Sequence, residues 1–80
     1  MAHGQPTTQI DGPGLRRRRE YAGLTLRAFA KRCREHGHPV SNSQLSKIER
    51  EQSRPRPGLL RALASALDIE VADLVKKDAA

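Results

Sequence analysis

The chain of 80 residues has few of the residues that cross-link small secreted domains or stack on single-stranded bases. It contains one cysteine, one tyrosine, one phenylalanine and no tryptophan. A single cysteine cannot form an internal disulfide, which agrees with a reducing cytoplasm. Because aromatic side chains are so scarce, the core must be aliphatic and rich in alanine, and the base-stacking modes of RNA and single-strand binding lack their platforms.

Long apolar runs and targeting signals are also missing. No stretch approaches the roughly 18 apolar residues of a membrane span, and the polar start of the chain, Met1 to Pro6, has no hydrophobic signal-peptide region. We therefore expect a soluble, cytoplasmic protein. Its length suits one domain, near the small end of what folds without disulfides or metals.

Positive charge is in excess and unevenly spread. The net charge is +6, but residues 16–61 hold 11 Arg and 2 Lys against four Glu, a net +9, which leaves −3 for the remaining residues. Such a basic segment implies a polyanionic partner, and duplex DNA is the first candidate because its phosphates supply much of the binding energy for basic proteins. RNA or an acidic membrane surface would also fit the charge alone.

Composition divides the chain into a leader, a domain and a tail. Residues 1–13 are predicted to be a disordered leader, because they hold Gly, Pro, Gln and Thr and little that is apolar besides Ile10. The leader has no Lys or Arg, which argues against a basic minor-groove arm of the homeodomain type. Residues 14–76 are predicted to form one domain, followed by a tail at residues 77–80.

The domain is predicted to be all-α, because hairpin turns and extended period-two alternation are absent. Helix starts are indicated by N-cap residues Thr25 and Ser41 and by Pro57, and helix ends by Gly23 and Gly37. These signals give five helices, over residues 14–22, 26–36, 41–50, 57–67 and 71–76.

Apolar side chains recur at helical spacing and define the expected core. The first helix contributes Leu15 and Ala22, with part of Tyr21. The other inward residues are Leu26, Phe29, Ala30 and Cys33, then Leu45 and Ile48, then Leu59, Leu60, Leu63, Ala64 and Leu67, and finally Ile69, Val71, Leu74 and Val75.

Four consecutive arginines, residues 16–19, circle the first helix, because successive helix positions lie about 100° apart. Their guanidinium groups therefore cannot all face one phosphate backbone. At least one must point inward or along the core, and it then needs a carboxylate because an unpaired buried charge is costly.

The helix over residues 41–50 has two unlike faces. Leu45 and Ile48 form an apolar face. The opposite face has only hydrogen-bonding side chains, of which one is charged: Asn42, Ser43, Ser46 and Lys47. Such a face suits the edges of base pairs, and an ordinary solvated face is the alternative interpretation.

Four segments of the chain, taken in order, form a recognisable pattern. They are Leu15-Arg16 through Glu20-Tyr21-Ala22-Gly23-Leu24-Thr25-Leu26, then Ser43-Gln44-Leu45-Ser46-Lys47-Ile48-Glu49-Arg50, then Arg54-Pro55, then Leu60-Arg61-Ala62-Leu63-Ala64-Ser65-Ala66-Leu67. In this order they resemble the Cro and phage-repressor type of helix-turn-helix domain, also called the xenobiotic-response-element family. The resemblance covers about residues 14–76.

This resemblance implies a compact five-helix bundle of the lambda-repressor-like type. Members of the family bind duplex DNA, usually as homodimers on inverted repeats, with the second helix of the motif in the major groove. No cofactor, metal or membrane partner is implied. The expected function is a sequence-specific transcriptional regulator, most often a repressor in this family.

Transferred by position, the resemblance implies roles for single residues. Arg19 and Glu49 would form an ion pair between the first and third helices, which agrees with the carboxylate that a buried arginine needs. The expected base contacts come from Asn42, Ser43 and Lys47, with Ser46 as a fourth. Expected phosphate contacts come from Thr25 and Leu26 at a helix N-terminus and from Arg27, Arg54 and Arg56, with Arg16 and Arg17 as weaker candidates and solvated charges as the alternative.

Two departures from the family pattern matter. The chain has roughly five additional residues between Thr25 and Leu45, placed at residues 34–39, so that either the second helix is longer or the turn is an open loop. Glu51 stands where the family usually has glycine. A left-handed backbone would be strained there, and a carboxylate facing phosphate would be unfavourable, so the loop after the third helix is expected to differ.

Other functions have weaker support. Cys33, His36 and His38 invite a zinc interpretation, but a closed site needs four ligands, and Cys33 also fits the apolar face of its helix as a small core residue. No catalytic constellation or phosphate loop appears, so the protein is not expected to be an enzyme. The alternative function is an antitoxin or another protein-interaction module of the same fold. That alternative predicts an obligate protein partner and an exposed apolar patch, expected on the last helix, which is also a candidate dimer surface.

Overall fold

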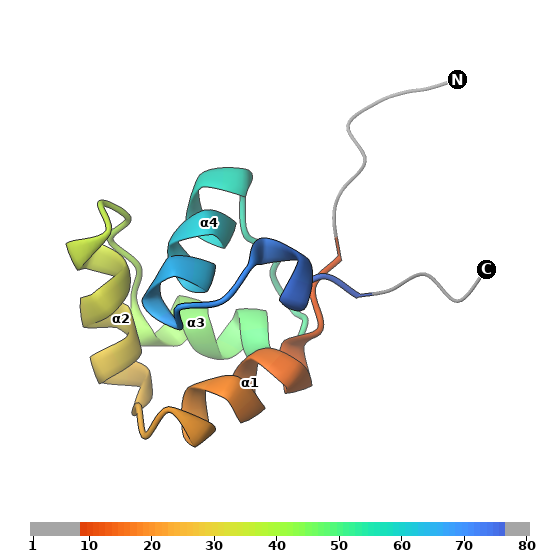
Figure 1. Ribbon diagram of the computed structural model, residues 1–80, viewed down its shortest axis with the longest axis horizontal. Coiled ribbons are helices and arrows are strands. Elements are labelled where there is room, and N and C mark those ends of the chain that lie inside the picture. Colours follow the sequence, from red (N-terminus) through yellow and green to blue (C-terminus); the bar gives the residue numbers. More distant parts are fainter. Residues whose placement is uncertain (1–8, 77–80) are drawn as a thin grey trace.

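Four α-helices and one short 3-10 helix make up the computed structural model, which describes residues 9–76 (Figure 1). In chain order they are α1 (Gly12–Tyr21), α2 (Leu26–Glu35), α3 (Asn42–Glu49), α4 (Pro57–Ala66) and η1 (Val71–Asp73). The described residues hold no strand, only an isolated antiparallel bridge between Ile10 and Val75. The all-helical class is therefore confirmed, whereas the count of five α-helices is not.

Local sequence signals explain where these helices begin. The side chains of Asp11, Thr25 and Ser41 each accept a hydrogen bond of 3.0 Å from the backbone N–H three residues later. Each bond satisfies an N–H that has no acceptor inside its helix. Pro57 opens α4, where its missing N–H costs nothing. Thr25, Ser41 and Pro57 act as the sequence predicts.

The start of α1 differs from the prediction. The helix begins at Gly12, two residues early, because Asp11 caps it. Ile10 is buried and pairs with Val75, so the assignment of residues 10–13 to a disordered leader is wrong. At the other end of α1, Tyr21 and Ala22 are exposed, so the prediction that they contribute to the core is wrong. Residues 1–8 and the predicted tail at 77–80 lie outside the described residues.

The last predicted helix is reduced to η1. Its backbone is drawn into pairing with the start of the chain: Asp11 N–H donates to the Leu74 carbonyl at 2.8 Å, and Lys76 N–H donates to the Gln9 carbonyl at 2.9 Å. A backbone N–H that donates across the molecule cannot also continue a helix. The predicted helix over residues 71–76 is therefore wrong beyond its first turn.

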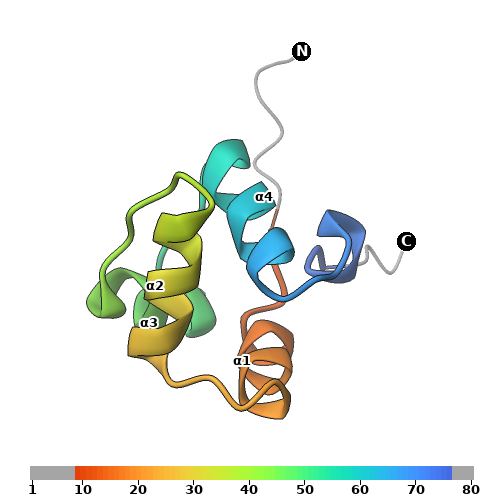
Figure 2. The same cartoon turned by 60° about the vertical axis from the view of Figure 1, so that its left-hand side comes forward.

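The core lies where the four helices meet. α3 packs against α1 and α2, α2 also packs against α4, and η1 covers α4 (Figure 2). Phe29 is the one aromatic residue in this core, as the scarcity of aromatics requires. Within residues 9–76, none of the helices is long and apolar enough to cross a bilayer. The largest fully buried side chains are Phe29, Leu15, Leu45, Ile48, Leu63, Leu74 and Cys33.

A buried ion pair joins α1 to the end of α3. Arg19 Nε donates to Glu49 Oε2 at 2.6 Å and Arg19 Nη2 to Glu49 Oε1 at 3.2 Å. Arg19 Nη1 also donates to the Leu24 carbonyl at 2.8 Å. Both residues are more than 90% buried, and the hydrogen bond to Glu49 raises the pKa of Arg19 above its ordinary value. Arg19 is thus the inward member of the four-arginine run.

We predict that Arg19→Ala lowers the free energy of unfolding by about 3–5 kcal/mol, because it leaves Glu49 as an unpaired buried charge. Arg16→Ala is the matched control, since Arg16 bonds Glu20 at 3.0 Å on the exposed face of the same helix. Loss of such an exposed pair costs at most about 1 kcal/mol. Urea denaturation measures both, and equal destabilisation by the two variants would contradict this role of Arg19.

Candidate nucleic-acid interface

The four polar side chains predicted on α3 lie on its outer side. Asn42, Ser43 and Lys47 are exposed and Ser46 is partly exposed, whereas the buried residues of this helix are Leu45, Ile48 and Glu49. At about 100° per residue, the four polar positions fall within an arc of about 140°. We call these four residues the α3 polar face. Its side chains form one contiguous surface that turns away from the core.

Arg50 belongs to the same arc, although the sequence alone did not single it out. It is the exposed C-cap residue of α3, and its backbone N–H donates to the Ser46 carbonyl at 3.0 Å. Its side-chain Nε lies 3.4 Å from that same carbonyl oxygen. Spacing could have identified it, because it follows Ser46 by four residues and Lys47 by three. With Arg50, the surface carries two positive charges at its C-terminal end.

The N-terminus of α2 supplies a second polar feature. The Thr25 hydroxyl accepts the N–H of Ala28, so it caps the helix. The N–H groups of Leu26 and Arg27 have no acceptor inside the helix, as at any helix start, and they can bind an anion. The side chains of Thr25 and Arg27 are exposed. This arrangement is compatible with the predicted phosphate contact.

Of residues 34–39, where the sequence places the additional residues, Arg34 and Glu35 end α2 and the other four lie in an open loop. α2 ends at Glu35 and α3 begins at Asn42, which leaves six residues between them, whereas a helix-turn-helix turn usually has three or four. Gly37 in this loop has φ 86°, a backbone conformation that favours glycine. Figure 2 shows the loop leaving the far end of α2 and returning to the start of α3. α2 and α3 nevertheless pack against each other.

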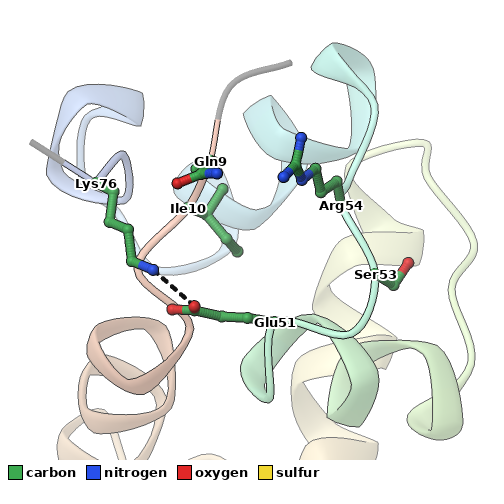
Figure 3. Close-up of a pocket in the computed structure, with 6 residues that line it drawn as sticks. All are labelled: Gln9, Ile10, Glu51, Ser53, Arg54 and Lys76. Atoms are coloured by element: carbon green, nitrogen blue, oxygen red, sulfur yellow. Dashed lines mark hydrogen bonds and ion pairs between the residues drawn. The ribbon is translucent and has the colours of Figure 1, made fainter. Parts of the chain in front are cut away.

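The two arginines after α3 differ from each other in where the structure places their side chains. Both Arg54 and Arg56 are exposed. Arg54 lines a polar recess of about 250 Å³ together with Gln9 and Ile10. Its side chain extends toward those residues and away from α3 (Figure 3). The structure therefore does not bring the Arg54 guanidinium onto the α3 polar face. Arg56 is the N-cap of α4 and makes no side-chain capping bond.

Cys33, His36 and His38, all within the described residues, do not form a ligand cluster. Cys33 is fully buried, and burial raises the pKa of its thiol to about 11. The His38 ring packs on the first turn of α4, because a Cβ added at Gly58 would lie only 2.6 Å from its Cε1 atom. Among residues 9–76, no group of three or more His, Cys, Asp or Glu is placed to hold a metal ion. Cys33 is a core residue.

Comparison with known protein families identifies a helix-turn-helix domain. A family model described as a helix-turn-helix domain matches residues 12–75, which span all four α-helices and η1. Its first matched residue is Gly12, where α1 begins. Neither the curated proteins nor the solved structures that were compared contain a match.

The buried thiol leads to a chemical prediction. Raising a pKa from 9.0 to about 11 lowers the thiolate fraction at pH 8 about a hundredfold, and only the thiolate is alkylated. Iodoacetamide should therefore modify native Cys33 at least about a hundred times more slowly than Cys33 in urea-unfolded protein, measured by mass spectrometry at pH 8. Equal rates in the two samples would contradict the burial of Cys33.

Proposed function

The chain belongs to the helix-turn-helix domain family, and from this premise we propose that it is a sequence-specific regulator that binds duplex DNA and represses transcription by occupying a promoter. The observation that carries the proposal is the α3 polar face, a contiguous outward surface of three neutral hydrogen-bonding side chains and Lys47, with the exposed Arg50 beside it. Members of this fold place such a helix in the major groove, which is wide enough to admit it.

Each residue of the face has a chemical role in this proposal. Asn42 can pair through two hydrogen bonds with adenine, and Lys47 can donate to O6 and N7 of guanine. Ser43 and Ser46 can donate or accept at either kind of base pair. Because the N-terminal residues of such a helix contact base edges, Arg50 at the opposite end is assigned to the phosphate backbone.

Phosphate contacts would fix the position of α3 on the duplex. We assign them to the Thr25 end of α2, to Arg27 and to Arg56, all of which are exposed. Arg54 takes the same role once its side chain turns away from Gln9 and Ile10. The +9 charge of residues 16–61 adds attraction that does not depend on sequence.

Two copies would bind together in this proposal. A single small module buries about 600–1,000 Å² against DNA, which is modest for tight binding. A homodimer on an inverted repeat, with half-sites about one helical turn apart, doubles the number of base contacts. The sequence selected from random duplexes should therefore be palindromic.

We predict that Lys47→Ala reduces discrimination between the selected duplex and a random duplex by about tenfold or more, the usual scale for one base contact. Lys31→Ala is the matched control, since Lys31 is an exposed lysine on α2. It removes the same charge and should weaken both duplexes alike. Selection from a random library, followed by titrations at fixed salt, measures both variants. Sequence-independent binding by wild type would overturn the proposed function.

A second candidate function has one observation in its favour. Tyr21 is 97% exposed and lines an open recess of about 300 Å³ with Ala22, Leu67 and Ile69. Arg17 and Arg18 border this recess. An exposed aromatic residue beside aliphatic side chains is typical of protein-binding surfaces. It supports an antitoxin or other interaction module, although the patch lies at the ends of α1 and α4 rather than on residues 71–76.

Complementation in cells that lack the native protein distinguishes the two functions. For a DNA-binding regulator, Asn42→Ala with Lys47→Ala should abolish complementation while Tyr21→Ala preserves it. For an interaction module the outcomes are reversed, because Tyr21 supplies the exposed contact area and α3 does not take part. Immunoblots verify that the variants accumulate equally. If both the α3 variant and Tyr21→Ala fail to complement, the protein needs both its DNA contacts and the protein contact at Tyr21.

A further inference from the structure

Glu51, the residue at which the chain departs from the family pattern, has an unusual backbone. Its φ is 61°, in the left-handed region that disfavours side chains. The surrounding hydrogen bonds are those of a Schellman motif: Glu51 N–H donates to the Ile48 carbonyl at 3.0 Å, and Gln52 N–H to the Lys47 carbonyl at 2.8 Å. Glycine is the common residue at this position of the motif. A glutamate there needs compensating contacts.

The carboxylate of Glu51 makes those contacts across the molecule. Oε2 accepts the backbone N–H of Gly12 at 2.9 Å, and Oε1 accepts Lys76 Nζ at 2.7 Å (Figure 3). Gly12 is the first residue of α1, where the helix dipole favours a negative charge. The bond from Lys76, followed by that from Gly12, lowers the pKa of Glu51 below its ordinary value. The carboxylate is therefore charged and doubly bonded at neutral pH.

The start of α1 also touches the end of α3 directly. A Cβ added at Gly12 would lie 2.3 Å from the Glu49 carbonyl oxygen and 2.7 Å from Glu51 Cγ. No side chain fits in this space, so the backbones meet. The adjacent segments are held by the Ile10–Val75 bridge and by the backbone bond from Lys76 to Gln9. Glu51 thus connects α3 to both ends of the described chain.

The Glu51 bonds affect the orientation of α3, because this helix is short and the loop before it is open. It has eight residues and follows the six-residue open loop, so the turn before it constrains its direction less than a tight turn would. Its C-terminal end is held twice, by the Glu49 pair with Arg19 and by the Glu51 bonds. The Glu51 bonds also direct a negative charge toward Lys76 and away from the α3 polar face.

We propose that Glu51 is a positioning residue for DNA recognition: its carboxylate fixes the end of α3 to Gly12 and Lys76 and so sets the orientation in which the α3 polar face meets the bases. This inference rests on the proposed function. It concerns Glu51 itself, since a family-type glycine could form the same turn but not these bonds.

The test compares Glu51→Gly with Glu35→Gln. Glu51→Gly removes the carboxylate while easing the left-handed backbone, so the fold is not expected to lose stability through strain. Glu35→Gln makes the same +1 change of net charge at an exposed residue at the end of α2. We expect Glu51→Gly to reduce discrimination between selected and random duplexes about tenfold, with a melting temperature near that of wild type. Glu35→Gln should leave discrimination unchanged.

Lys76→Met is an intermediate variant, because it removes one of the two side-chain partners and keeps the Gly12 bond. It should reduce discrimination by about threefold. Amide hydrogen exchange provides a readout that does not involve DNA. In Glu51→Gly the Gly12 amide, which donates to the carboxylate, should exchange faster than in wild type. The Gln52 amide, whose backbone bond a glycine turn keeps, and the Leu45 amide near the start of α3 should remain protected.

The outcomes separate the two hypotheses. If wild type selects no sequence, the proposed function fails. Unchanged exchange at Gly12 in Glu51→Gly would then also show that the Glu51 carboxylate does not hold the start of α1. If wild type is selective and Glu51→Gly is equally selective, the positioning role is overturned and the proposed function stands. Loss of selectivity with faster exchange at Gly12 supports the positioning role. Loss with a collapsed melting transition assigns Glu51 to stability alone and rejects the positioning role.

Discussion

The arrangement of the helices depends on the ion pair between Arg19 and Glu49. Both groups are almost completely buried, and their two parallel bonds form only when α1 and the end of α3 have one relative position. Any shift would leave a charge in the core without its partner, which is far more costly than losing an apolar contact. The pair therefore makes the packing of α3 specific as well as stable, and it decides which side of α3 faces outward.

Two carboxylates at the end of α3 are paired within the molecule, Glu49 in the core and Glu51 at the surface, which leaves the outer surface of α3 positive. Glu49 is bonded by Arg19, and Glu51 by Lys76 and the Gly12 amide. Lys47 and Arg50 stay exposed. The negative charges of Glu49 and Glu51 are paired with groups of the same chain. The charges that remain for a phosphate backbone to contact on α3 are therefore positive. The same contacts that fix α3 also shape its electrostatic surface.

Features that depend on nearby residues were predictable from the sequence. Thr25, Ser41 and Pro57 mark helix starts because their effect is confined to one turn. The polar and apolar faces of α3 follow from its 3.6-residue period. The need of one arginine for a buried carboxylate followed from the helix geometry of residues 16–19, and the structure contains the pair. The family resemblance, not the periodicity, pointed to Glu49 as the partner.

The sequence by itself determined the all-helical class, the helix starts at α2, α3 and α4, and the composition of the α3 polar face, since each rests on interactions within a few residues. The tertiary structure alone decided the burial of Ile10, the short η1, the direction of Arg54 and the bonds of Glu51. In these cases the contacts form between distant segments, as when the ends of the described chain pair at Ile10 and Val75. No local pattern encodes them, because their free energy depends on where the whole chain brings its backbone together.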